Sequence, residues 1–339
     1  MKAPERVLLA HGGGGRLTRQ LVEGLFLPAL ENPYLATLTD AAVLPDIPPG
    51  RPALTTDAFV VDPPVFAGGN IGCLSVYGTV NDIAMSGARP LWLTWALILE
   101  EGLDGELLET CVRSAARAAK EAGVMIVAGD TKVVPRGKAD RVFAVTAGFG
   151  VVPPGRDLSD AHISPGDAIL VSGPIGDHGA TVLAHRHGME APGLKSDCGS
   201  LASLVEALLD SGVAVRSLHD PTRGGVVTVC HEVAERSGCR VVLVESDLPV
   251  RREVAGVCDL LGMDPFALAC EGRALAWVAP EDVDRALEVM RAHPDGAGTT
   301  VIGHMEAGRA GAPPVILKTS VGGERPLDLL SGHDLPRIC

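Results

Sequence analysis

Apolar and polar positions alternate along the first half of the chain in short runs that predict helices and strands in turn. Residues 71–87 and 103–123 carry apolar side chains at helical spacing, and Gly87 and Gly123 stand where helices commonly end. The runs between and around these helices are short and apolar, which favours strands. The predicted strands are residues 51–61, 91–100, 124–130 and 141–152.

The density of Pro, Gly, Asp and Ser at residues 154–167 indicates a linker, which sets the N-terminal domain at 1–153. A strand, a Gly-rich loop and a helix follow it and open a second alternating run, predicted as the C-terminal domain at 168–308. Residues 309–339 are polar and rich in Gly and Pro, and are expected to form a closing segment and tail. The pattern predicts a two-domain α/β protein, and 339 residues allow each domain its own core.

The overall charge narrows the classes of partner. A net charge of −13 disfavours nucleic acid and anionic membrane, because neither is attracted to an acidic surface. No run reaches about 18 apolar residues, and Pro4 with its flanking charges interrupts the start, so no membrane span or signal peptide is predicted. We therefore expect a cytoplasmic protein. The eight cysteines form no CxxC pair, which disfavours a zinc ribbon or a thioredoxin-type site.

Aspartates recur at the ends of predicted strands or beside glycines. One such residue alone is interpreted as a turn or a helix cap, but five favour a binding site, because ligands commonly bind at strand ends in α/β sheets. Oxygen ligands spread over several loops suit Mg²⁺ held together with a polyphosphate. The five are Asp40, Asp57, Asp82, Asp130 and Asp220.

Two glycine-rich segments offer what a bound anion needs. HGGGGR at residues 11–16 lets backbone N–H groups approach an anion, and FAGGNIG at 66–72 leads into a helix N-terminus with the same capacity. Neither is a Walker A sequence, and no GxGxxG follows a strand in the Rossmann manner. Taken alone, HGGGGR is interpreted equally well as a flexible loop.

Three further residues stand out by position. Lys132 follows GDT at the end of a predicted strand, where an exposed lysine is the default interpretation. Glu271 lies between apolar runs, where a buried carboxylate has a raised pKa suited to proton transfer, although a solvent-facing turn fits equally. Cys339 is the last residue, on a polar segment where a thiol is an oxidation liability unless it has a use.

These motifs occur together in one order: HGGGGR, TTDAFVV, GTVNDIAMSGARP, AGDTKVV, HDPTRGG, ACEGR and the closing PRIC. In this the chain resembles, over essentially its full length, the HypE family of nickel–iron hydrogenase maturation proteins. That family belongs to a superfamily with aminoimidazole ribonucleotide synthetase and selenophosphate synthetase. The Gly and Asp motifs are shared across the superfamily and imply only the use of ATP, whereas PRIC is specific to the HypE family.

The resemblance implies an ATP-dependent carbamoyl dehydratase and a use for the final thiol. In this family the terminal cysteine, here Cys339, receives a carbamoyl group from the carbamoyltransferase HypF. ATP then drives dehydration of the S-carboxamide to a thiocyanate, and the cyano group passes to iron on a HypC–HypD complex. The implied fold is α/β of the α+β type, with two PurM-like domains, a homodimer formed through the N-terminal domains, and a mobile C-terminal tail.

The resemblance also implies residue roles. Lys132 neutralises charge near the transferred phosphoryl group, Glu271 accepts an N–H proton, and His219 and His231 are candidates for assisting. Mg²⁺ is held by Asp40, Asp82 and Asp220, while Asp57 and Asp130 contact metal, phosphate, ribose or backbone. The full set of residues expected at ATP is His11, Gly12, Gly13, Gly14, Gly15, Asp57, Asn81, Gly129, Asp130 and Thr131.

Two rival interpretations stay open. Another ATP-dependent enzyme of the superfamily, such as a ring-forming synthetase or a selenophosphate synthetase, acts on small molecules and has no need of Cys339. A selenium enzyme also needs a reactive residue near its start, and no cysteine precedes Cys73. The second rival is a non-catalytic partner with a docking tail. Prenylation of that tail is excluded, because a prenylated CaaX cysteine is the fourth residue from the end, whereas Cys339 is the last.

Overall fold

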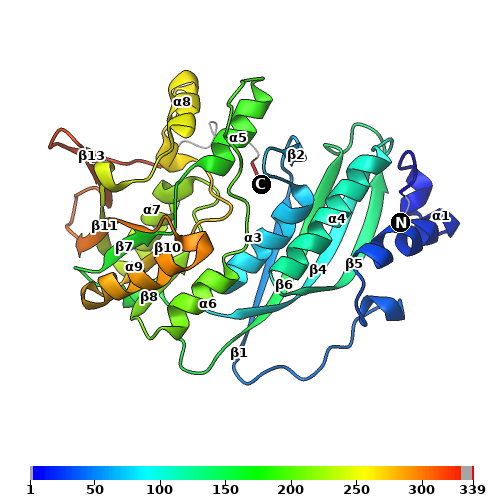
Figure 1. The fold of residues 1–339 in the computed structure, drawn as a ribbon, viewed down its shortest axis with the longest axis horizontal. Coiled ribbons are helices and arrows are strands. Elements are labelled where there is room, and N and C mark those ends of the chain that lie inside the picture. Colours follow the sequence, from blue (N-terminus) through cyan, green and yellow to red (C-terminus); the bar gives the residue numbers. More distant parts are fainter. Residues whose placement is uncertain (1–2, 330–337) are drawn as a thin grey trace.

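Two β-sheets, one in each half of the chain, form the frame of the molecule (Figure 1). The structure is a computed structural model that describes residues 3–329 and 338–339. The first sheet has four strands in the order β1-β6-β4-β5, with β4 and β5 parallel and the other neighbours antiparallel. Its strands are β1 (Arg51–Phe59), β4 (Arg89–Glu100), β5 (Met125–Val134) and β6 (Val142–Val152), which confirms the four predicted strands.

The two predicted helices of this half are also present and cover one face of the sheet (Figure 1). They are α3 (Ile71–Met85) and α4 (Gly105–Glu121). Asn70 caps α3 by accepting the N–H of Gly72 at 2.8 Å, and Asp104 caps α4 by accepting the N–H of Glu106 at 2.9 Å. Gly123 follows α4 with a φ of 71°, a left-handed conformation that glycine adopts without strain.

The opposite face of the first sheet is open. Side chains alternate along each strand, so that Ala58, Val145, Ala96 and Asp130 form one outward row across the sheet. On this face Leu54 is 77% exposed and Val145 36% exposed. Apolar residues on a strand face are usually covered, so this surface is suited to a packing partner.

The second sheet has seven strands in the order β13-β12-β9-β11-β7-β10-β8. Two of them, β12 and β13, come from the closing segment beyond residue 309, where the sequence analysis expected no strand. They are only four and three residues long, too short for a period to show in the pattern. The strands are β7 (Ala168–Val171), β8 (Val215–His219), β9 (Cys239–Val244), β10 (Leu275–Val278), β11 (Thr300–Ala307), β12 (Val315–Lys318) and β13 (Glu324–Pro326).

Shorter elements complete the fold. The N-terminal segment forms α1 (Arg16–Leu21) and α2 (Leu27–Ala29) beside β5, and a small hairpin joins β2 (Val65–Phe66) to β3 (Gly69–Asn70). None of the helices among the described residues has the length and apolar character needed to span a bilayer. The helices of the second half are α5 (Asp177–Arg186), α6 (Ala202–Asp210), α7 (Gly225–Ser237), α8 (Arg252–Leu261) and α9 (Val283–Ala292).

Helix α3 lies between the two halves (Figure 1). It contacts β1 and β6 on one side and α6 and β8 on the other, so almost all of its residues are buried. A helix surrounded in this way needs apolar or small residues on every face, which its sequence provides. Polar side chains near its C-terminal end therefore meet residues of both halves.

Candidate functional site

An acidic cluster lies where the two halves meet. Asp57 faces inward from β1, Asp82 comes from α3, and Asp220 follows β8. Burial, followed by the charge of Asp82, raises the pKa of Asp57 to about 6. Burial, followed by the charges of Asp82 and Asp57, raises the pKa of Asp220 to about 7. Burial also raises the pKa of Asp82, whose Oδ2 accepts the hydroxyl of Thr55 at 2.9 Å. The three carboxylates are close enough to repel one another.

Glu271 closes the cluster from the second half. Its side chain is 2% exposed, and burial, followed by the charges of Asp220 and Asp197, raises its pKa well above the usual range. Of the two interpretations that the flanking apolar runs left open, the structure has the buried carboxylate and not the solvent-facing turn. Its Oε1 has no hydrogen-bond partner among the described residues. The raised pKa favours the protonated form of Glu271, and its unpartnered Oε1 is available to exchange a proton with a ligand.

The last two residues of the chain lie against this cluster. Ile338 is 5% exposed and joins the apolar core of the first half. Burial, followed by the charge of Glu271, raises the pKa of the Cys339 thiol to about 12, and Arg223 opposes that shift. The thiol is thus protonated in this position. Of the PRIC motif, Pro336 and Arg337 lie outside the described residues, as does Gly332.

Arg223 is the cation that faces this cluster. Its charge acts on Asp57, Asp82 and Cys339. Arg223 is not among the predicted site residues, although it stands in HDPTRGG, the segment that contains the predicted Asp220. An arginine in a motif already assigned to a phosphate-binding site was the signal that could have found it.

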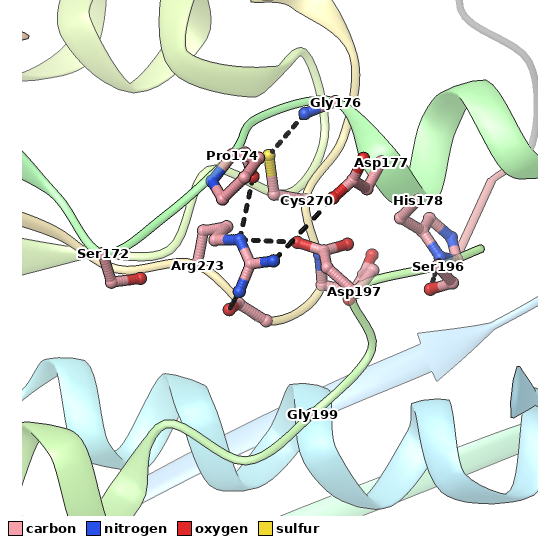
Figure 2. Close-up of polar contacts among 12 residues, drawn as sticks. Ser172, Pro174, Gly176, Asp177, His178, Ser196, Asp197, Gly199, Cys270 and Arg273 are labelled. Carbon is pink, nitrogen blue, oxygen red and sulfur yellow. Dashed lines mark hydrogen bonds and ion pairs between the residues drawn. The ribbon is translucent and has the colours of Figure 1, made fainter. Parts of the chain in front are cut away.

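The loop at residues 196–199 supports Glu271 and is braced by an arginine. The N–H of Glu271 donates to Asp197 Oδ1 at 3.1 Å, and its carbonyl accepts the N–H of Gly199 at 3.3 Å. Figure 2 shows Arg273 between Asp177 and Asp197, 3.8 and 3.7 Å from their carboxylates. Arg273 ends the ACEGR motif, but no motif marks Asp177 or Asp197, because their contacts with Arg273 join segments far apart along the chain.

A second group of predicted residues lies along β5. Lys132 Nζ is 2.9 Å from Asp130 Oδ2, and their side chains are 64% and 61% exposed. The hydrogen bond from Lys132 lowers the pKa of Asp130. Asp40, Gly129, Asp130 and Thr131 line a cavity of about 300 Å³ between β5 and the N-terminal segment.

The two groups lie at opposite edges of the first sheet. Asp57 on β1 is in register with Thr146, then Trp95, then Gly129 on β5. Three strand spacings separate the edges by roughly 14 Å. The structure therefore does not bring Asp40 to Asp82 and Asp220, as the predicted metal site requires. Among the described residues, no three or more His, Cys, Asp or Glu side chains are arranged to hold a metal ion.

The glycine loop and two other predicted ligands have mainly internal contacts. His11 Nδ1 accepts the N–H of Leu8 at 2.9 Å, and a Cβ on Gly12 would come within 2.4 Å of the Val133 nitrogen. Gly14 and Gly15 border open space, and a Cβ on Gly13 would meet only the Ala10 carbonyl oxygen, at 3.8 Å. Asn81, expected at ATP, instead has its amide engaged: it donates to the Gly199 carbonyl at 3.0 Å and accepts the Leu201 N–H at 2.8 Å. It ties α3 to the loop that supports Glu271.

The two assisting histidines have structural partners. His219 Nε2 lies 2.8 Å from Asp160 Oδ1, and its ring meets Trp277 edge-on at 5.6 Å. His231 Nε2 lies 2.6 Å from the Leu327 carbonyl oxygen. Through Nε2 of each ring, these contacts hold elements of the second half together.

Comparison with known proteins identifies the family. Residues 38–152 match the family described as AIR synthase related protein, N-terminal domain, and residues 164–315 match its C-terminal domain. A carbamoyl dehydratase HypE of Rhodobacter capsulatus is 47% identical over 339 residues, covering 99% of this chain and 98% of the relative. The chain belongs to the HypE family of carbamoyl dehydratases. The two-domain α/β fold that the resemblance implied is confirmed with it.

Solved HypE structures have the same fold. A crystal structure of hydrogenase maturation protein HypE in complex with ATP superposes with a TM-score of 0.93 at 44% identity, covering 98% of this chain and 99% of that one. A HypE–HypF complex gives a TM-score of 0.79 at 42% identity, covering 91% and 99%. This member of the HypE family therefore carries two separate groups of candidate residues, the acidic cluster between its halves and the group along β5.

Proposed function

We propose that this chain uses ATP to dehydrate an S-carboxamide on Cys339 to a thiocyanate, which supplies cyanide for the iron of a nickel–iron hydrogenase. The position of the Cys339 thiol beside the buried Glu271 carries the proposal. A carbamoyl group on that sulfur lies within the acidic cluster, which an exposed tail cysteine would not reach. The similarity of this chain to carbamoyl dehydratase HypE of Rhodobacter capsulatus and to the ATP-bound HypE structure supports the proposal.

The chemistry needs a better leaving group and a base. An amide oxygen leaves poorly, so the carbamoyl oxygen first attacks the terminal phosphorus of ATP and displaces ADP. The C–O bond then breaks to release phosphate, while the nitrogen loses both protons and the C≡N bond forms. Catalysis of such phosphoryl transfer is mostly positioning and charge neutralisation, which explains why few residues act as acid or base.

Glu271 is the proposed acceptor of an N–H proton. Its Oε1 has no hydrogen-bond partner among the described residues, which leaves it available to a ligand. Its pKa is raised partly by the charges of Asp220, Asp57 and Asp82. A cation bound by those three aspartates would remove the repulsion and lower the pKa of Glu271, which would make it a base. Among the described residues the three carboxylates are not arranged around a metal ion, yet their hard oxygens are the ligands that Mg²⁺ prefers, and bound Mg²⁺ would neutralise charge on the phosphates. Asp57 joins Asp82 and Asp220 in this set.

A homodimer would bring the second group into use. The outer face of the first sheet exposes Leu54 and Val145 in the same surface as Asp130 and Lys132, and both β1 and β5 are edge strands. A two-fold partner covering this face places the β5 edge of one copy at the β1 edge of the other. Asp40, Asp130 and Lys132 of one copy then complete the phosphate site at the aspartates of its partner.

Two protein partners and a location complete the proposal. The known HypE–HypF complex supports a carbamoyltransferase of the HypF type as the donor. The acceptor is an iron-carrying complex of the HypC–HypD type. We place this series of reactions in the cytoplasm, where ATP is available.

Mass spectrometry of the intact chain tests this function. After incubation with the carbamoyltransferase, carbamoyl phosphate and Mg–ATP, the wild type gains one carbamoyl group and then loses the mass of one water. Cys339→Ser gains nothing, while it still binds ATP. A carbamoyl group found on another residue, or ATP turnover coupled to a free small molecule in the Cys339→Ser variant, would contradict the proposal and favour a small-molecule enzyme of the superfamily.

A further inference from the structure

The carbonyl of Ile338 has a dedicated partner in the second half. His178 is fully buried near the start of α5, and its Nε2 lies 2.8 Å from the Ile338 carbonyl oxygen. Its Nδ1 lies 2.8 Å from Ser196 Oγ, and its ring meets Phe66 edge-on at 5.2 Å. The imidazole is therefore fixed on three sides, and the last peptide bond of the chain is held by a rigid group rather than by a surface contact.

The hydrogen atoms of this contact are determined by its partners. A carbonyl oxygen only accepts, so His178 Nε2 carries the proton that it donates to Ile338. Burial lowers the pKa of His178, which keeps the ring neutral, and Nδ1 then accepts the hydroxyl proton of Ser196. Ser196 Oγ in turn accepts the N–H of Cys198 at 3.0 Å. The Ile338 carbonyl thus fixes the tautomer, and Ser196 holds the orientation of the ring through its other nitrogen.

The same loop that orients His178 also holds the proposed base. Ser196 opens the loop, which continues through Asp197 to Gly199 (Figure 2). Asp197 and Gly199 bind the backbone of Glu271. The two segments touch so closely that a Cβ on Gly272 would come within 1.9 Å of the Asp197 carbonyl oxygen. One rigid loop, residues 196–199, therefore fixes the positions of both the Ile338 carbonyl, through His178, and Glu271.

Holding the carbonyl of Ile338 restricts where the sulfur can be. Only the peptide nitrogen, Cα and Cβ of Cys339 separate that carbonyl from the thiol. The buried Ile338 side chain anchors the residue from the other side. A group on the sulfur is then confined to a small volume beside Glu271, which is how enzymes lower the entropic part of a barrier.

We propose that His178, oriented by Ser196, is a positioning residue that holds the Ile338 carbonyl and so places the modified Cys339 against Glu271. The inference rests on the proposed function of Cys339. The site recognises a short peptide end, by one backbone carbonyl and one aliphatic side chain, and needs no contact with the thiol itself. His178 moves no proton in the reaction.

Two substitutions of His178 form a matched pair. His178→Gln keeps an N–H donor at the place of Nε2, whereas His178→Asn moves the amide to the place of Nδ1 and leaves the Ile338 carbonyl without a donor. Both remove the ring, so they share any loss of packing against Phe66. Thermal unfolding of each variant shows whether it folds. Should His178→Asn not fold, Ile338→Ser removes the anchor from the tail instead, with Ile338→Val as its control.

Two measurements read out the position of the tail. In the first, Cys339 of the unmodified chain is alkylated with a small thiol reagent and followed by mass spectrometry of the final peptide. In the second, the carbamoylated chain receives Mg–ATP, and the loss of one water is timed in a single turnover. His178→Asn should be alkylated roughly tenfold faster and dehydrated roughly tenfold more slowly than the wild type, the size of one buried hydrogen bond. His178→Gln should stay within about twofold in both, as one retained hydrogen bond requires.

Equal rates for His178→Gln and His178→Asn, in either measurement, would overturn the proposal, since the hydrogen bond would then make no difference. The two proposals fail separately. A wild type that never loses water contradicts the proposed function, and the alkylation rates still decide whether His178 holds the tail. Normal dehydration in the wild type with no difference between the paired variants leaves the function standing and removes the role of His178.

Discussion

The cluster between the two halves and the group along β5 contain the same kinds of residue in opposite physical states. Asp57, Asp220 and Glu271 are held where burial and mutual repulsion raise their pKa values. Asp130 and Lys132 are exposed and neutralise each other across 2.9 Å. Within one chain, the buried cluster thus favours bound protons, whereas the β5 group lies on the surface as an exposed ion pair. The difference is what we expect if, as proposed, a single copy holds the thiol and the base but only part of the phosphate site.

The largest expected effect comes from the base. Glu271→Gln keeps the shape of the side chain and removes its ability to accept a proton, so dehydration of carbamoylated Cys339 should slow on the order of a thousandfold. Loss of a buried acid should not lower the free energy of unfolding near neutral pH. Single-turnover mass spectrometry and thermal unfolding measure the two quantities. A folded variant that dehydrates at the normal rate would remove Glu271 from the chemistry.

Asp82→Asn tests the acidic cluster itself. We expect Mg²⁺-dependent ATP hydrolysis to fall by roughly a hundredfold, because a misplaced cation no longer neutralises the developing phosphate charge. The Thr55 hydroxyl can still donate to the amide oxygen, so the fold should survive. Phosphate release at several Mg²⁺ concentrations measures the effect, with Asp259→Asn on exposed α8 as the control. Unchanged hydrolysis in the folded variant would show that the cluster does not serve the nucleotide.

The pH dependence of stability should separate the two groups by sign. In the absence of Mg²⁺, folded Asp220 keeps its proton to about pH 7, whereas the unfolded side chain loses it near pH 4. Folding is therefore weakened as the pH rises from about 4 to about 7. Asp220→Asn removes this penalty, so its free energy of unfolding relative to the wild type should increase across that range. Urea unfolding at several pH values measures it, and a constant difference would contradict a raised pKa.

Asp130→Asn should give the smallest effect and the opposite sign. The pKa of Asp130 is lowered by Lys132, so its contribution is present above its usual pKa and is lost as the pH falls. Because both side chains are exposed, solvent screening limits the loss to about 0.5 kcal/mol at neutral pH in the monomer. The same urea series detects it. A loss several times larger would show that the β5 group is buried in solution.

The fold was largely predictable because its longest elements have a clear period. Helix α4 shows helical spacing of apolar residues and a glycine stop, and the strands of the first sheet are long apolar runs. The exceptions are β12 and β13, whose few residues carry no period. For Glu271 the flanking apolar runs fitted a buried carboxylate and a solvent-facing turn equally, and only the structure decides for burial.

The arrangement of the site was less predictable because it depends on contacts between distant segments. Asp40 and Asp82 carry similar local signals, and only the strand order shows that they lie at different edges of the sheet. Asn81 stands in a ligand-like motif, yet its amide is used to hold a loop over 100 residues away. His178 has no motif of its own, and its importance comes from Ile338 at the other end of the chain.

The most direct test of the central claim mixes two inactive variants. Lys132→Ala disables the β5 group of a copy, and Glu271→Gln disables its interdomain cluster. If each working site combines the cluster of one copy with the β5 group of its partner, a dimer of the two variants contains one intact site. Random exchange of subunits should then restore about a quarter of the wild-type dehydration rate, since half of the dimers are mixed and each has one working site of two. No recovery above the separate variants, in samples shown to contain mixed dimers, would contradict a site shared between copies.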